Sequence, residues 1–112
     1  MMQQKICFVT NKEPFDYTLS IISGKWKLKI IYLLACVTSA RYNMLKRCIA
    51  GITHKMLSTQ LKELEQAEVI SRKEYPQIPP KVEYSLTSKG ESLIPILNAM
   101  CIWGKEYTQN AD

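Results

Sequence analysis

The sequence predicts a mainly helical α+β fold, and three observations support this prediction. Apolar residues recur at helical spacing through most of the chain up to about residue 67. Two runs that alternate apolar and polar residues, at 69–75 and 81–86, flank a proline-rich segment and predict a β-hairpin. The apolar run after Thr87 predicts a C-terminal helix. With 112 residues, 46% of them hydrophobic, we expect one domain over residues 1–112 that begins with an N-terminal arm at 1–14.

Three helices are predicted in the first half of the chain. Residues 15–23 form a short amphipathic helix, and Gly24 ends it. Residues 25–37 show the clearest helical pattern, which begins at Trp26. A second short helix covers residues 41–49, and its basic side chains point away from its apolar stripe. The residues expected to face inward include Leu19, Ile22, Ile30, Leu34, Tyr42 and Leu45.

A sharp turn and a fourth helix follow. Gly51 can adopt the positive φ that reverses the chain, and Thr53 can cap the next helix with its hydroxyl oxygen. That helix runs to about residue 67. Two short helices joined by a glycine-containing turn are typical of the helix–turn–helix motif. The buried stripe of the second helix is expected to consist of Leu57, Leu61 and Leu64.

The hairpin and the last helix complete a winged helix–turn–helix with a wing of two or three β-strands. Prolines at the hairpin tip lack the N–H that a strand ladder needs. The last helix, at 87–107, is apolar almost all round, so it must be covered on more than one side. We expect a second copy of the chain to cover it, and we expect Pro95 to kink or divide it. The expected dimer-interface residues are Leu93, Leu97, Met100, Cys101 and Trp103.

Basic residues dominate the middle of the chain. The net charge is +5, and no Asp or Glu occurs between residues 17 and 62. A block of this kind creates a positive field in any compact fold, and polyphosphate backbones are the commonest partners of such a field. Charge alone would equally suit a solvated basic face, so the expectation of double-stranded DNA as the partner depends on where the helices place these side chains. The basic residues of the block are Lys25, Lys27, Lys29, Arg41, Lys46, Arg47, Lys55 and Lys62.

Several other functions are not expected. No apolar run is long enough to cross a bilayer, and the N-terminus lacks a signal-peptide pattern, so we expect a cytoplasmic protein. The sequence has no arrangement of carboxylates, nucleophile and base, or Gly-rich phosphate loop that would indicate an enzyme. The four cysteines are widely spaced and there is one His, so neither a metal nor a cofactor is expected. Cys36 and Cys48 are expected to be buried as small apolar residues.

The chain contains, in this order, Gly24-Lys25-Trp26 and the helix after it, 41–46, 51–57, 61–65, 75–87 with Gly90, Leu93, and Trp103-Gly104. Together, in this order and spacing, these segments resemble the HxlR-type family of winged helix–turn–helix regulators. The resemblance covers about residues 7 to 104. It implies a dimeric DNA-binding regulator. In several family members a cysteine near the N-terminus responds to oxidants or electrophiles, and Cys7 lies at a similar position, although Phe8 follows it where the family often has Pro.

The expected DNA contacts follow from this arrangement. The recognition helix at 53–67 is expected to lie in the major groove, because residues at the start of such a helix reach the base edges. The wing at 75–81 is expected to lie on the phosphate backbone or in the minor groove. Phosphate contacts position a protein without reading sequence. The expected DNA-contacting residues are Lys25, Arg41, Thr53, His54, Lys55, Ser58, Thr59, Lys62, Arg72, Lys73 and Lys81.

Two alternatives stand beside a sequence-specific transcription regulator. In the first, the regulator releases DNA when an oxidant, an electrophile or another small-molecule inducer acts through Cys7. Reactivity of that kind requires a thiolate, which nearby cations such as Lys5 and Lys12 favour. In the second, the winged fold is a protein-interaction module that does not bind DNA. The absence of acidic residues between 17 and 62 argues against the second alternative.

Overall fold

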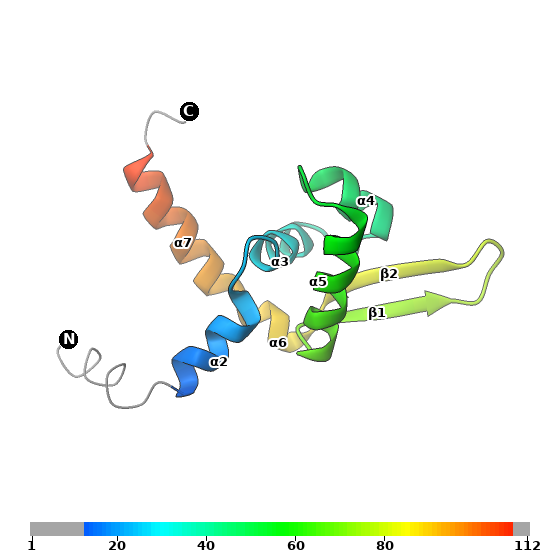
Figure 1. Ribbon diagram of the computed structural model, residues 1–112, viewed down its shortest axis with the longest axis horizontal. Coiled ribbons are helices and arrows are strands. Elements are labelled where there is room, and N and C mark those ends of the chain that lie inside the picture. Colours follow the sequence, from blue (N-terminus) through cyan, green and yellow to red (C-terminus); the bar gives the residue numbers. More distant parts are fainter. Residues whose placement is uncertain (1–12, 109–112) are drawn as a thin grey trace.

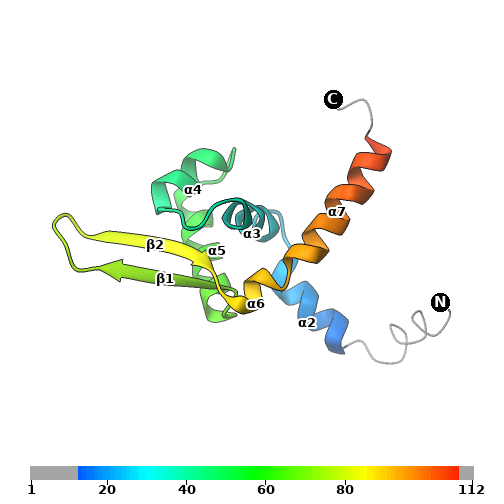
Figure 2. The same ribbon diagram turned by 180° about the vertical axis from the view of Figure 1, so that it is seen from behind.

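The computed structural model describes residues 13–108, and a two-stranded wing extends from one end of a helical body (Figure 1). The mainly helical α+β prediction is confirmed. Helices α2 and α7 lie at the end of the molecule opposite the wing tip in both views (Figures 1 and 2). The elements are α2 Glu13–Ile22, α3 Lys27–Cys36, α4 Tyr42–Cys48, α5 His54–Gln66, β1 Ile70–Tyr75, β2 Lys81–Leu86, α6 Ser88–Glu91 and α7 Ile94–Tyr107. Residues 1–12 of the predicted arm lie outside the described residues, and its last two residues belong to α2.

Helix α2 packs on the core through Ile21, whereas its sequence pattern predicted Leu19. Ile21 is buried, whereas Leu19 is 39% exposed, so the inward position predicted for Leu19 is wrong, while the predicted Ile22 is partly buried against the core. The reason is that α2 projects away from the body, and its last turn is the part that meets α3 (Figure 1). Gly24 follows with φ +97°, a left-handed conformation that glycine adopts without steric cost.

The helix–turn–helix formed by α4 and α5 is confirmed in detail. Gly51 has φ +85°, and Ile52 beside it is buried in the core. The Thr53 hydroxyl accepts a hydrogen bond of 3.1 Å from the backbone N–H of Met56, which satisfies one of the unpaired donors at the start of α5. The buried residues of α5 are the predicted Leu57, Leu61 and Leu64.

The wing consists of β1 and β2, paired antiparallel from Ile70↔Leu86 to Tyr75↔Lys81. A third strand is replaced by a single bridge between Ala40 and Tyr84, in which each residue donates its N–H to the carbonyl of the other at 2.9 and 2.8 Å. Both of these residues are buried. The bridge therefore ties the loop before α4 to the middle of the wing.

The predicted last helix is divided in two. The Thr87 hydroxyl caps α6 by accepting from the backbone N–H of Gly90 at 3.1 Å, and α7 begins anew at Ile94. Pro95 is the second residue of α7. A backbone N–H in the first turn of a helix has no intrahelical acceptor, so the lack of an N–H at Pro95 removes no hydrogen bond from α7. Inside a continuous helix the same proline would have left the carbonyl of Glu91 unpaired. The prediction that Pro95 divides the helix is confirmed.

One hydrophobic core joins the helices to the base of the wing. Val69 and Ile70 are at most 1% exposed, so the first strand is anchored where it leaves α5. No helix within residues 13–108 combines the length and the apolar character needed to cross a membrane. The core consists of Ile21, Trp26, Ile30, Ile31, Leu34, Ala40, Leu45, Ile49, Ile52, Leu57, Leu61, Leu64, Val69, Ile70, Tyr84 and Leu97.

Candidate DNA-binding surface

The polar face of α5 lies opposite its buried leucines. Because the leucines recur every three or four residues, the side chains between them point away from the core. All six recognition-helix candidates are exposed. They form a continuous polar surface, which we call the α5 face. The α5 face consists of Thr53, His54, Lys55, Ser58, Thr59 and Lys62.

Tyr42, at the start of α4, holds part of the α5 face in place. Its hydroxyl donates to the backbone carbonyl of His54 at 3.1 Å, and the same oxygen lies 3.1 Å from His54 Nδ1 and 3.2 Å from Ser58 Oγ. The rings of Tyr42 and His54 are nearly parallel, 5° apart, with centroids separated by 5.8 Å. His54 therefore has its Nδ1 engaged and its Nε2 left to meet another group.

The sequence interpretation missed this role of Tyr42. It placed Tyr42 on the apolar stripe of α4, and the ring is indeed partly buried against the core. A tyrosine carries a polar tip on an apolar body, and a buried tip needs a hydrogen-bond partner. That requirement could have indicated a contact with a neighbouring element, although the pattern alone does not say which one.

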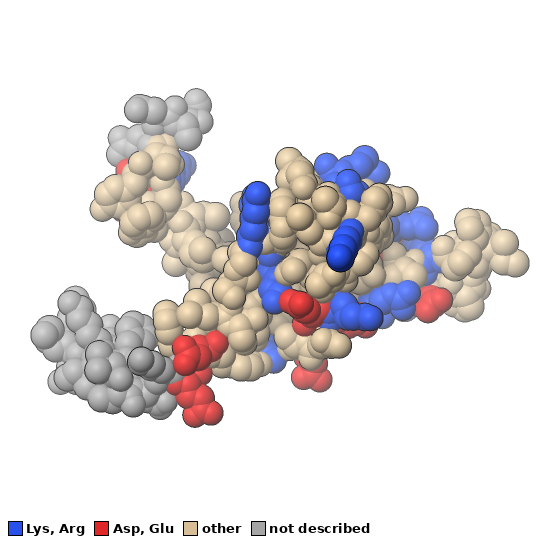
Figure 3. Space-filling view, in the orientation of Figure 1, with Lys and Arg blue, Asp and Glu red and all other residues tan. Residues whose placement is uncertain are grey.

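The lysines at the start of α3 differ in their surroundings. Lys27 forms an ion pair of 2.7 Å with Glu63 on α5, so its charge is offset. The ammonium groups of Lys25 and Lys29 instead lie 4.8 and 5.3 Å from the centre of the Trp26 ring. Trp26 packs beside Gly51, so these two lysines lie near the turn that precedes α5. Figure 3 shows several separate Lys and Arg side chains spread over this face of the body.

Arg41 lies at the junction between α4 and the wing. It is exposed, and together with Arg47 and Glu83 it lines a hollow of about 440 Å³ between α4 and β2. The pKa of Glu83 is lowered mainly by the hydrogen bond that it accepts from Tyr75, and the charges of Lys81 and Arg41 lower it further while burial opposes them. One carboxylate therefore lies among the cations at this junction.

The three wing cations do not share one face. Lys73 lies on the same face as Tyr75, which pairs with Lys81 across the hairpin. Arg72 lies on the opposite face, where it is 3.5 Å from Glu74 and opposite the buried Tyr84. The wing thus brings Lys73 and Lys81 together on one face and places Arg72 on the opposite face.

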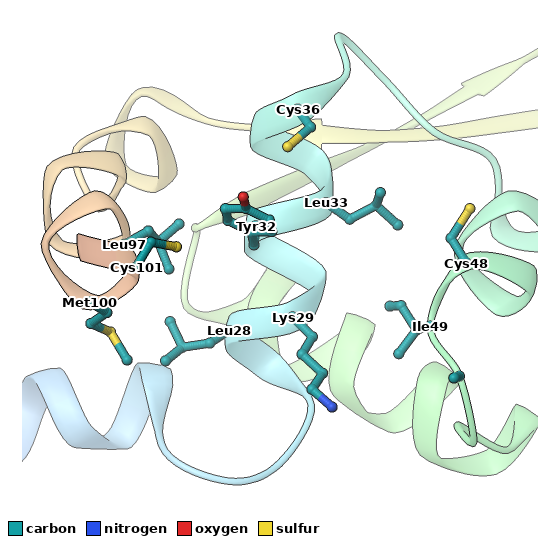
Figure 4. Close-up of a pocket in the computed structure, with 11 residues that line it drawn as sticks. Leu28, Lys29, Tyr32, Leu33, Cys36, Cys48, Ile49, Leu97, Met100 and Cys101 are labelled. Atoms are coloured by element: carbon teal, nitrogen blue, oxygen red, sulfur yellow. The ribbon is translucent and has the colours of Figure 1, made fainter. Parts of the chain in front are cut away.

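The described cysteines are exposed, so the prediction that Cys36 and Cys48 are buried is wrong. With Cys101 they line a groove of about 510 Å³ among α3, α4 and α7 (Figure 4). The pKa of the Tyr32 hydroxyl is raised first by the charge of Cys101 and then by that of Cys36, because negative sulfur disfavours a phenolate. Residue type alone suggested burial, whereas the position of each cysteine on its helix decided its exposure. Cys7 lies outside the described residues.

The apolar residues of α7 divide between the core and the surface. Leu97 is 5% exposed and packs in the core of its own chain, and Leu93 is partly buried against that core. Leu97 is therefore corrected from interface to core, whereas the interface role of the half-buried Leu93 stays a prediction. A second set of large side chains is exposed at spacings of four, three and four residues, which places them along one side of a helix. This set, the α7 stripe, consists of Ile96, Met100, Trp103 and Tyr107.

The model of the HxlR-like helix-turn-helix family matches residues 21–112. The chain belongs to this family. An HTH-type transcriptional regulator of Halalkalibacterium halodurans is 59% identical to this HxlR-like chain over 97 residues, which are 87% of this chain and 86% of the relative. Another HTH-type transcriptional regulator, YdzF of Bacillus subtilis, is 53% identical over 95 residues, with 85% and 87% coverage.

Solved structures of similar proteins share the HxlR-like architecture. The redox regulator HypR in its oxidized form has a TM-score of 0.78 and 43% identity, over 83% of this chain and 95% of that one. The reduced form of the transcriptional regulator YodB from B. subtilis has a TM-score of 0.76 and 32% identity, over 89% of this chain and 97% of that one. The winged helix–turn–helix prediction and the family resemblance are therefore confirmed.

Proposed function

We propose that this HxlR-like protein is a sequence-specific DNA-binding transcription regulator that acts as a homodimer in the cytoplasm. The α5 face carries the proposal, because it presents hydroxyls and cations on a helix whose other side is fixed in the core. A major groove admits one α-helix, and each base pair presents a distinct pattern of donors and acceptors there. Lys55 and Lys62 would meet phosphates or base acceptors, while Ser58 and Thr59 offer short hydroxyls.

The neighbouring cations extend this surface in two directions. Lys25 and Lys29 lie near the turn before α5, and Lys73 and Lys81 lie along one face of the wing. Contacts from both sides would fix the register of α5 on the duplex. The wing would then follow the phosphate backbone or the minor groove beside the site that α5 reads.

Selection of binding sites from random double-stranded DNA tests the proposal. We expect the enriched duplexes to contain two half-sites related by two-fold symmetry, with centres about 34–36 Å apart or a multiple of that spacing. Affinity for them should fall steeply with salt, since each neutralised phosphate releases a counterion. Failure of any sequence to be enriched over many rounds would contradict the proposal.

The α7 stripe supports the homodimer. Trp103 is 66% exposed and Met100 49% exposed, and the rings of Trp103 and Tyr107 are 4.9 Å apart. Large apolar side chains in a row along one helix face are stabilised when another surface covers them. A second α7 offers the same stripe, so an interface with two-fold symmetry would cover both. The wings would then lie far from the dimer axis, as two half-sites require.

Replacing Trp103 with Ala is expected to weaken the dimer by about 30-fold, since a buried Trp at the centre of an interface typically contributes 2 kcal/mol or more. Sedimentation over a range of concentrations measures the change. Ile102→Ala is the matched control, because Ile102 is equally exposed, at 69%, but lies off the stripe. Equal dissociation constants for wild type and Trp103→Ala would place the dimer contact elsewhere.

A redox-responsive regulator that is switched through Cys7 is the second candidate. The similarity to HypR, a redox regulator, favours it, and YodB has been solved both reduced and after treatment with diamide. We expect a Cys7→Ser protein to bind the selected duplex as wild type does but to keep it when diamide is added. If diamide releases both proteins equally, the response belongs to another thiol, and the exposed Cys101 is then the first to replace.

A further inference from the structure

The tip of the wing, residues 76–80, is uncharged, and four of its five residues, all except Gln77, are apolar. Ile78 is 99% exposed, the highest value among the large hydrophobic residues in the described part of the chain. A side chain so exposed packs against nothing in its own chain and contributes nothing to folding through burial. In Figure 3 the outer end of the wing carries neither basic nor acidic side chains, although basic groups lie closer to the body.

The tip also has few hydrogen-bond donors. Three of its five residues are prolines, which have no backbone N–H. The N–H of Gln77 already donates to the carbonyl of Tyr75 at 2.9 Å. The backbone at the tip therefore offers few hydrogen-bond donors to base edges, so that capacity lies mainly in the side chain of Gln77, and Ile78 supplies the one large aliphatic side chain.

The stem behind the tip is held together and is basic. The Tyr75 hydroxyl donates to Glu83 at 3.0 Å, and the ammonium groups of Lys73 and Lys81 lie 4.9 and 4.7 Å from the centre of the Tyr75 ring. Lys81 also lies 3.3 Å from Glu83. These contacts hold Lys73 and Lys81 side by side immediately behind the tip. Glu83 offsets part of the charge of Lys81, and both ammonium groups can still meet phosphates at the edge of a groove.

We propose that Ile78 is a wedge that enters the minor groove of the bound duplex and partly unstacks one base step, while Lys73 and Lys81 contact the flanking phosphates. This inference rests on the proposed DNA-binding function. Paired strands lie about 4.8 Å apart before their side chains are counted, and the minor groove is about 6 Å wide, so a single side chain at the tip can enter where the whole ribbon cannot. Apolar side chains inserted in this way kink DNA toward the major groove.

The test compares wild type with Ile78→Ala and Ile78→Leu on a duplex selected by the wild-type protein. We expect wild type and Ile78→Leu to bend the duplex by at least 20°, measured by energy transfer between dyes at its ends. For Ile78→Ala we expect less than half of that bend and an affinity lower by about 10-fold. The fluorescence of a 2-aminopurine placed at the unstacked step should increase when wild type binds and stay quenched when Ile78→Ala binds. Ile102→Ala is the control for truncation of an exposed isoleucine elsewhere.

The outcomes distinguish failure of the Ile78 wedge from failure of the proposed DNA-binding function. If wild type binds a selected duplex but Ile78→Ala bends it equally and binds equally, the wedge is wrong and the proposed function stands. If Ile78→Ala changes the oligomeric state and leaves DNA binding as it was, the tip is a protein contact and the wedge is again wrong. If no duplex is selected by wild type, the proposed function itself fails.

Discussion

A protein in which Lys55 and Lys62 are both replaced by Glu is expected to bind its selected duplex at least 100-fold more weakly. Both lysines are exposed on the α5 face, and within residues 13–108 neither forms an ion pair. A hydrogen bond to a charged group typically contributes about 1.5–3 kcal/mol, so the loss of two corresponds to 100-fold or more. Each new carboxylate would also be repelled by the phosphates.

Fluorescence anisotropy at several salt concentrations measures this change. The slope of log affinity against log salt should become shallower by about 2, because two phosphate contacts are lost. Lys105→Glu is a control for charge reversal far from α5, since Lys105 lies in the last turn of α7. The double variant should remain a dimer by sedimentation. Unchanged DNA affinity in the double variant would instead favour a protein-interaction module.

Replacing Gly90 with Ala is expected to lower the free energy of unfolding by about 3 kcal/mol, the upper part of the range for overpacked cores. Gly90 is buried, and a Cβ on it would overlap the backbone carbonyl oxygen of Val69 and lie 3.1 Å from a Leu86 methyl group. The Val69 carbonyl cannot retreat easily, because it accepts from the Thr87 N–H at 3.0 Å. The joint between wing and α6 would therefore have to shift.

Thermal unfolding followed by circular dichroism measures the effect, and we expect the midpoint to fall by roughly 15 °C. Gly104→Ala is the matched control, because a Cβ at Gly104 would meet no atom within 4 Å. Alanine also has the higher helix propensity, so this variant should unfold at or above the wild-type temperature. A midpoint for Gly90→Ala within 2 °C of the wild-type value would contradict this expectation and show that the joint accommodates the added Cβ without loss of stability.

Local features of the fold could be predicted because nearby residues decide them. Gly51 reverses the chain because it alone at that turn tolerates positive φ, and Thr53 ends the turn because its hydroxyl pairs with an N–H three residues on. Pro95 divides the last helix because it has no backbone N–H to donate to the carbonyl four residues before it. The leucine stripe of α5 followed in the same way from helical periodicity.

Features that depend on which surfaces meet could not be predicted in this way. Leu97 and Trp103 are both apolar residues of one helix, yet α3 covers the first and the described residues leave the second 66% exposed. Cys36 is exposed although its residue type favours burial. The contact of Tyr42 with His54 and Ser58 joins residues 12 and 16 positions apart. A local sequence pattern does not show which residues so far apart in the chain will be in contact.

The sequence by itself therefore determined the order and the type of the elements, the turn and caps of the helix–turn–helix, and the basic polar face of α5. These depend on backbone conformations and side-chain periodicities that a few neighbouring residues set. Tertiary structure alone decided which cations share a face of the wing, which α7 residues are left for a partner, and how Tyr42 orients the start of α5. Those outcomes depend on the packing of elements against one another, since a side chain's exposure is set by its neighbours in space.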